Sequence, residues 1–213
     1  MHGPELLFAT GNRSKLAQMA FVIQALNSPV RLVPARQRHG DAARYAEVGA
    51  TGSDIARRGA LEVAARVGEP VFTEDTTLRV AALGGRPGVE ARAYLLERGR
   101  SGLLDELQGV SDRYAEITSA LAWATPEGDL RVWVNVVPGH IAAEERFIPG
   151  MPPWVAPQPV LPDGGGYNAV FIPCGQTRTL AEIPPEEGLR LAYREPNFRA
   201  ALAFLMECSQ APT

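Results

Sequence analysis

The sequence is nearly without lysine: Lys15 is the only one, and every other basic side chain apart from histidine is arginine. A lysine ammonium is a compact point charge and an arginine guanidinium is a planar fork, so the two are not interchangeable. A single lysine in so arginine-rich a chain is therefore a candidate for a task that needs a point charge. Retention by chance is the alternative.

Several other features are scarce or missing. The two cysteines, Cys174 and Cys208, lack a metal-ligand spacing and cannot build a disulfide framework, so we expect buried or idle thiols. No charged segment precedes an apolar run, and no run is long enough to span a bilayer, which predicts a cytoplasmic protein without a membrane partner. The net charge of -3 and the lack of a polybasic patch argue against a nucleic-acid partner. Without a linker or repeat, residues 1–213 are predicted to form one domain.

Two neighbouring carboxylates, Glu74 and Asp75, follow the apolar run 70–72 and precede Thr76 and Thr77. Acids at the mouth of a buried strand lose hydration unless a cation or hydrogen-bond donors replace it. Paired acids beside hydroxyl side chains suit a hard divalent cation such as Mg²⁺ that also carries substrate phosphates. A surface turn with two solvated acids is the alternative at this point.

The first apolar run, 5–9, is predicted to be a buried strand that leads directly into a polar segment. This segment consists of Thr10, Gly11, Asn12, Arg13, Ser14 and Lys15. Apolar residues then recur at helical spacing from 16 to 26, so Asn12 or Ser14 can cap a helix. Backbone N–H groups at such a start bind phosphate. The spacing is not that of a P-loop, and a capped helix with an exposed lysine is the alternative.

The rest of the chain mixes strands and helices. Strands are expected at 30–34, 117–124, 130–137 and 169–172, helices at 51–67, 91–107 and 198–207, and loops at 36–44 and 149–162. A turn at 125–129 joins two strands as an antiparallel pair, and the helix at 91–107 breaks near Gly99 and Gly102. The loop 149–162 is proline-rich, extended, and contains Trp154. This order predicts an α/β fold with a mixed sheet flanked by helices.

Three segments, 9–15, 74–78 and 82–88, occur in an order that resembles the inosine triphosphate pyrophosphatase family, also called Ham1-like or non-canonical purine nucleoside triphosphate pyrophosphatases. The similarity extends over nearly the whole chain. It implies an elongated mixed sheet in two lobes with a central cleft, and a homodimer. It also implies Mg²⁺-dependent hydrolysis of a nucleoside triphosphate to the monophosphate and pyrophosphate, with deaminated purines as the usual bases.

The resemblance assigns roles residue by residue. Lys15 would neutralise the phosphates, Glu47 and Glu74 would be metal ligands, and Asp75 would bind metal or orient and deprotonate the attacking water. The expected substrate-binding residues are Thr10, Gly11, Asn12, Arg13, Ser14, Lys15, Thr76, Trp154, Gly166, Tyr167, Asn168, Tyr193 and Arg194.

The chain departs from the family pattern mainly where the base and part of the triphosphate are expected. An aromatic residue is replaced by Gly165, an aspartate by Asn168, and the Ser-His before Arg194 by Ala192 and Tyr193. Family lysines are replaced at Gly59 and Gly188, and a family asparagine at Ile55; Arg57 or Arg58 is a partial substitute for the lysine missing at Gly59. These changes affect substrate specificity more than the chemistry.

We expect Gly165 to open room that Trp154 fills as a stacking platform, with Asn168, Tyr193 and Arg194 reading the edge of the base. A Trp154 that merely anchors its loop is the alternative. Two other functions stay open at this point: a noncatalytic nucleotide-binding protein with the family fold, and a hydrolase of a specialised biosynthetic nucleotide.

Overall fold

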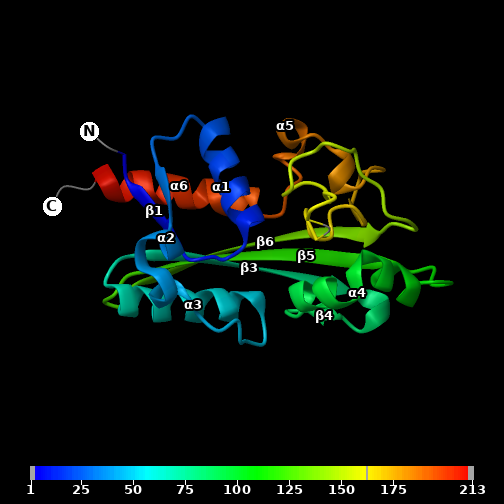
Figure 1. Ribbon diagram of the computed structural model, residues 1–213, viewed down its shortest axis with the longest axis horizontal. Coiled ribbons are helices and arrows are strands. Elements are labelled where there is room, and N and C mark those ends of the chain that lie inside the picture. The colour runs from blue at the N-terminus through cyan, green and yellow to red at the C-terminus, as the bar shows by residue number, and fades with distance from the viewer. Residues whose placement is uncertain (1–2, 162, 211–213) are drawn as a thin grey trace. The chain divides into compact units, whose positions relative to one another are not determined.

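The computed structural model describes residues 3–161 and 163–210 (Figure 1). Pro162, the last residue of the predicted loop 149–162, lies outside the described residues. The helices are α1 (Arg13–Ala25), α2 (Ala35–His39), α3 (Gly52–Val67), α4 (Ala91–Glu106), α5 (Pro185–Gly188) and α6 (Glu195–Gln210), with 3-10 turns η1 (Gly40–Ala43), η2 (Ala81–Leu83) and η3 (Leu180–Glu182). The strands are β1 (Glu5–Phe8), β2 (Arg31–Pro34), β3 (Val71–Val80), β4 (Pro87–Gly88), β5 (Tyr114–Ala124), β6 (Leu130–Ile141) and β7 (Phe171–Pro173).

The strands form one mixed sheet, which confirms the predicted α/β class. Their order is β2-β1-β3-β5-β6-β7, and β4 pairs with β3. β1 runs parallel to β2 and β3, whereas β4 is antiparallel to β3, and β7 is antiparallel to β6. β1 ends at Phe8, which pairs with Phe72, so β3 continues well beyond the end of β1.

The chain divides into two compact units. The first unit contains the chain up to Asp75, Ser119–Asn135 and the chain from Arg194 on, and the second contains Thr76–Thr118 and Val136–Tyr193. β3, β5 and β6 continue from one unit into the other. Within the first unit, α1 and α6 cover one face of the strands and α3 covers the opposite face (Figure 1).

Ring and hydrogen-bond contacts identify these two faces. Phe8 of β1 meets Phe198 of α6 edge to face, with ring centroids 6.1 Å apart. On the other face the Thr73 hydroxyl donates to the Ala56 carbonyl of α3 at 2.6 Å. A core rich in alanine and valine lies between α3 and the sheet, so the helix approaches the strands closely.

Most predicted elements are confirmed, and three local predictions are wrong. The polar stretch 36–44 forms the short helices α2 and η1 instead of a loop. Glu74 and Asp75 lie inside the ten-residue strand β3, neither at its mouth nor in a surface turn. The loop 149–161 folds into successive turns, with a bridge between Gln158 and Leu161, and is not extended.

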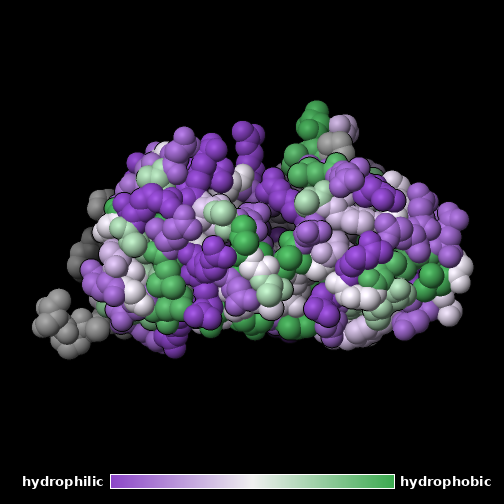
Figure 2. Space-filling model, turned by 90° about the horizontal axis from the view of Figure 1, so that it is seen from below, coloured by the Kyte–Doolittle hydropathy of each residue, from purple (hydrophilic) through white to green (hydrophobic). Residues whose placement is uncertain are grey.

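The surface matches an ordinary globular protein. On the face shown in Figure 2, hydrophilic and hydrophobic residues are interspersed. Cys174 and Cys208 are free and exposed, so of the expected buried or idle thiols the buried alternative is wrong and the idle one stays a prediction. Within residues 3–161 and 163–210, no helix combines the length and the apolar character that crossing a membrane requires.

Candidate active site

The polar segment 10–15 lies beside β3, because the chain passes it immediately after β1 ends. The Ala9 amide still donates to the Phe72 carbonyl at 2.8 Å, as a further step of the parallel pairing. Lys15, on the first turn of α1, then reaches back and donates from Nζ to the Glu74 carbonyl at 2.6 Å. The early end of β1 therefore brings the predicted phosphate loop to the two acids of β3.

Asn12 fixes the shape of this loop as the cap of α1. Its side-chain oxygen accepts from the Ser14 amide at 2.9 Å and from the Lys15 amide at 3.3 Å. The backbone amide of Asn12 donates to the Thr10 hydroxyl at 3.1 Å. Asn12 is therefore the cap, not Ser14. Lys15 is buried, which contradicts the alternative of an exposed lysine.

The Glu74 carboxylate balances two cations. Its Oε2 accepts from Lys15 Nζ at 2.9 Å and from Arg194 Nε at 3.2 Å, and its Oε1 accepts from the Ser119 hydroxyl at 2.8 Å. The Glu74 side chain is 0% exposed, so these donors replace its hydration.

Two amides hold the partners of Glu74 in place. Asn197 of α6 donates from Nδ2 to the Ser119 carbonyl at 2.9 Å and to its hydroxyl at 3.1 Å. Arg194 uses Nη1 to donate to Gln18 Oε1 at 3.1 Å. Sequence reasoning missed Ser119, Asn197 and Gln18. The available signal was Ser119 itself, a hydroxyl residue directly before the apolar stretch of β5 from Ala120 to Ala124.

Asp75 lies on the opposite face of β3 from Glu74. Side chains alternate along a strand, so Asp75 shares the α3 face with Thr73, and Glu74 shares the α6 face with Phe72. Phe72 stacks on Trp133 at 6.3 Å, and Trp133 contacts Phe204 of α6, which supports this assignment. The two acids therefore do not form a two-carboxylate pair on one face.

Asp75 is a buried acid with an unsatisfied oxygen. Its Oδ2 is buried and accepts no hydrogen bond in the described part of the chain. Burial raises the pKa of Asp75 to about 6, against the opposing charge of Lys15, while Glu74 and Glu47 raise it further. Such an oxygen is a ready ligand for a hard cation.

Glu47 is the third acid of the predicted metal site, and the structure does not bring Glu47, Glu74 and Asp75 together as one group of ligands. Glu47 is exposed, and no group of three or more Asp, Glu, His or Cys side chains able to hold a metal occurs among the described residues. Mg²⁺ is commonly held by only one or two carboxylates together with substrate phosphates and water. The unsatisfied oxygen of Asp75 fits that mode, and the carboxylate of Glu47 also acts electrostatically on Asp75.

Tyr45 occupies the space beside Gly59 where the family places a lysine. A Cβ on Gly59 would lie 2.5 Å from the Tyr45 ring, so a longer side chain there requires the ring to move. Burial, followed by the negative charges of Glu47, Asp75 and Glu74, raises the pKa of Tyr45. Arg58 donates to the Val48 carbonyl at 2.8 Å, next to Glu47.

The second unit contains the residues predicted to bind the base except Arg194, which lies in the first unit and pairs with Glu74. Several of the others have structural contacts. Asn168 donates from Nδ2 to the carbonyls of Trp154 at 3.3 Å and Val155 at 3.1 Å. Tyr167 donates its hydroxyl to the Ala91 carbonyl at 2.7 Å. Tyr193 is buried in the core of this unit, and Trp154 is half-buried. Thr76, half-buried, continues β3 into this unit.

The expectation that Gly165 opens room for an aromatic platform is wrong. Gly165 has φ +69°, and a Cβ on it would lie 2.5 Å from the Val155 carbonyl oxygen. The backbone of the neighbouring loop fills that space. Gly166, at φ +57°, instead offers its carbonyl to Arg100 Nη1 at 2.7 Å.

Comparison with known proteins gives a consistent set of similarities. A family model described as the Ham1 family matches residues 6–204. A dITP/XTP pyrophosphatase from Thermococcus kodakarensis is 34% identical over 164 residues, which cover 76% of this chain and 80% of that protein. One from Pyrobaculum aerophilum is 31% identical over 200 residues, covering 92% and 94%. The solved structure of a HAM1 protein from Coxiella burnetii is 25% identical with a TM-score of 0.75, covering 96% of this chain and 99% of that one.

Proposed function

This chain belongs to the Ham1 family, and from that premise we propose that it hydrolyses nucleoside triphosphates to the monophosphate and pyrophosphate. The observation that carries the proposal is the buried contact of the only lysine with β3. Lys15 stands at the start of a helix, at the end of a polar loop, and bonds to Glu74 next to the unsatisfied acid Asp75. Amide donors, a helix N-terminus and a point charge together favour a polyphosphate.

In the proposed reaction, the oxygen of a water molecule bonds to the α-phosphorus. The bond from that phosphorus to the oxygen bridging the α and β phosphates breaks, and pyrophosphate leaves. Asp75 accepts a proton from that water, and a carboxylate with a pKa of about 6 is ionised at neutral pH and able to do so. Lys15 and Arg194 supply positive charge to the phosphates. Positioning and charge of this kind account for most catalysis of phosphoryl transfer.

We propose that Asp75 and Glu47 hold Mg²⁺. When bound, the cation would offset negative charge on the phosphate oxygens and lower the pKa of a coordinated water. Glu74 has a different role in this proposal. Its two oxygens already accept from an ammonium, a guanidinium and a hydroxyl, which supports a positioning role for Glu74 rather than metal ligation.

We propose non-canonical purine triphosphates as the substrates, since the curated relatives are named for dITP and XTP. The test is a panel of dITP, XTP, ITP and the four common triphosphates, with and without Mg²⁺, in which pyrophosphate and orthophosphate are measured separately. We expect pyrophosphate as the product, and faster release from the deaminated purines than from ATP or GTP.

Two results would contradict the proposal. Orthophosphate as the first product would place cleavage at a different bond. Nucleotide-induced thermal stabilisation without turnover of any substrate would favour a noncatalytic binding protein. We also propose a homodimer from the family resemblance, and light scattering coupled to size-exclusion chromatography tests it.

A further inference from the structure

The charges around Lys15 largely cancel. Lys15 and Arg194 contribute two positive charges, and Glu74 and Asp75 contribute two negative charges when ionised. A triphosphate carries several negative charges and therefore requires additional cations at the loop. The sole lysine, already paired with a carboxylate, is not sufficient to supply them.

Arg36 places an additional guanidinium directly against this loop. It is the second residue of α2, and its head lies so close to Gly11 that a Cβ there would be 2.6 Å from Cζ and 2.8 Å from Nη2, and closer still to Nη1. Gly11 therefore permits the approach of Arg36 by lacking a side chain. The Arg36 side chain is exposed and has no hydrogen bond or ion pair with any described residue.

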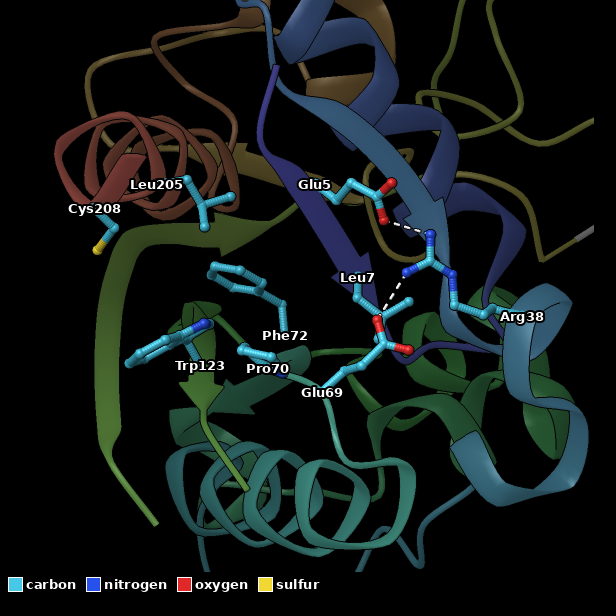
Figure 3. A pocket seen from close by; sticks show the side chains of 9 residues that line it. All are labelled: Glu5, Leu7, Arg38, Glu69, Pro70, Phe72, Trp123, Leu205 and Cys208. Carbon is cyan, nitrogen blue, oxygen red and sulfur yellow. Dashed lines mark hydrogen bonds and ion pairs between the residues drawn. The ribbon is translucent and has the colours of Figure 1, made fainter. Parts of the chain in front are cut away.

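Arg38, two residues further along the same helix, has the opposite environment. It donates from Nη1 to Glu69 Oε2 at 2.8 Å and from Nη2 to Glu5 Oε2, and it lines a separate pocket of about 250 Å³ in the first unit (Figure 3). Its charge is therefore neutralised by two carboxylates. Arg36 and Arg38 differ in their partners although they share the helix and the residue type.

Position 59, where the family resemblance implies a lysine, cannot supply a cation in this chain. Position 59 holds glycine, and the Tyr45 ring fills the space in which a side chain at that position would lie. The positive charge of Arg36 also acts on Tyr45: it opposes the shift by which burial and the nearby acids raise the pKa of Tyr45.

We propose that Arg36 is a polyphosphate-binding residue, and that it supplies the uncompensated positive charge which Lys15, paired with Glu74, does not. This inference deepens the proposed function and rests on it for the identity of the ligand. A guanidinium can donate two parallel hydrogen bonds to phosphate oxygens, which an ammonium at position 59 could not reproduce.

The test is isothermal titration of the metal-free protein with inorganic triphosphate at fixed ionic strength. We expect Arg36→Ala to weaken binding about tenfold, as loss of one charge-assisted contact predicts. Arg36→Lys should recover part of the affinity. The matched control is Arg38→Ala, which removes the same charge from the same helix and should leave the affinity unchanged. Equal losses in Arg36→Ala and Arg38→Ala, or no loss in either, would overturn the proposal.

Gly11→Ala tests the same contact from the other side, because its added methyl group must displace the flexible end of Arg36. We expect Gly11→Ala to weaken triphosphate binding in the wild-type background and to add little further loss to Arg36→Ala. Additive losses would contradict the direct contact. Since the ligand is inorganic triphosphate and no turnover is measured, this result is independent of the nucleotide panel: absence of hydrolysis would refute the proposed reaction without altering the binding comparison.

Discussion

The two units hold their polar residues in different ways. In the first unit, charged side chains bind one another, as do Lys15 of α1, Glu74 of β3 and Arg194, which directly precedes α6. In the second unit, the predicted base-binding residues Tyr167 and Asn168 bind backbone carbonyls, and Arg100 binds both a carbonyl and the Glu145 carboxylate. Arg100 donates to the carbonyl of Gly166, and Asn168 donates to those of Trp154 and Val155.

This difference affects how far the role of a site residue can be predicted from the sequence. A contact between charged side chains depends on residue types that are visible in the sequence. A contact to a carbonyl depends on where the backbone runs, because every residue supplies a carbonyl. Residue identity therefore singled out Lys15, Glu74 and Arg194 as candidates in the first unit, whereas in the second unit it leaves binding and structural roles indistinguishable.

The largest expected effect is on Asp75. Asp75→Asn keeps the size of the side chain and removes the charge, so we expect turnover to fall by at least about a hundredfold. In the metal-free protein at neutral pH it should raise the melting temperature by a few degrees, because a buried, unsatisfied charge is removed. Pyrophosphate release and thermal unfolding in chelator measure the two effects.

The same substitution has a predicted pH dependence. The pKa of Asp75 is raised in the folded protein to about 6, so the contribution of Asp75 to the stability of the metal-free wild type is fully present below the unfolded value near 4 and is lost as pH rises through about 6. Lys15 and Arg194 oppose this change, while Glu47 and Glu74 add to it. Asp75→Asn should lack this change. A variant with full turnover, or with an unaltered pH profile of stability, would contradict the role of Asp75.

The second expected effect separates Glu74 from Glu47. Glu74→Gln leaves two buried cations without their counter-charge, and loss of one partner of a buried pair costs about 3 to 5 kcal/mol. Glu47→Gln, at an exposed position, should leave stability unchanged and raise the Mg²⁺ concentration required for turnover. Chemical denaturation and Mg²⁺ titration of both variants provide the comparison. A raised Mg²⁺ requirement in Glu74→Gln without loss of stability would make Glu74 a metal ligand after all.

How far the sequence predicted the molecule depended on the kind of contact. The periodic patterns predicted most helices and strands, and the asparagine before α1 was one of two expected caps. The length of β3 was missed because its central acids and threonines do not alternate with apolar residues. Arg36 was assigned to a loop, since the four successive polar residues 36–39 do not show a helical period. The sequence predicts that Glu74 and Asp75 point to opposite faces only if both residues are assigned to a strand.

The third prediction tests whether position 165 is structural. Gly165→Ala and Gly166→Ala both introduce a side chain at positive φ, so their backbone strain is comparable. Only Gly165→Ala brings a Cβ to 2.5 Å from a carbonyl oxygen, whereas nothing lies within 4 Å of a Cβ at Gly166. We expect Gly165→Ala to be less stable than Gly166→Ala by about 1 to 3 kcal/mol in urea denaturation. Equal stabilities would mean that position 165 has room for a side chain.

The smallest expected effect concerns Trp154. Asn168 donates to the Trp154 carbonyl and so fixes the backbone from which the indole projects. We therefore expect Trp154→Ala to weaken nucleotide binding about tenfold, through loss of stacking on the base, and to leave binding of inorganic triphosphate unchanged. Trp154→Phe, which keeps an aromatic face, should recover most of the loss. The ring only anchors its loop if wild type, Trp154→Phe and Trp154→Ala bind nucleotide with equal affinity but differ in thermal stability. Parallel losses for nucleotide and inorganic triphosphate would mean that Trp154 affects the phosphate site of the first unit instead of the base.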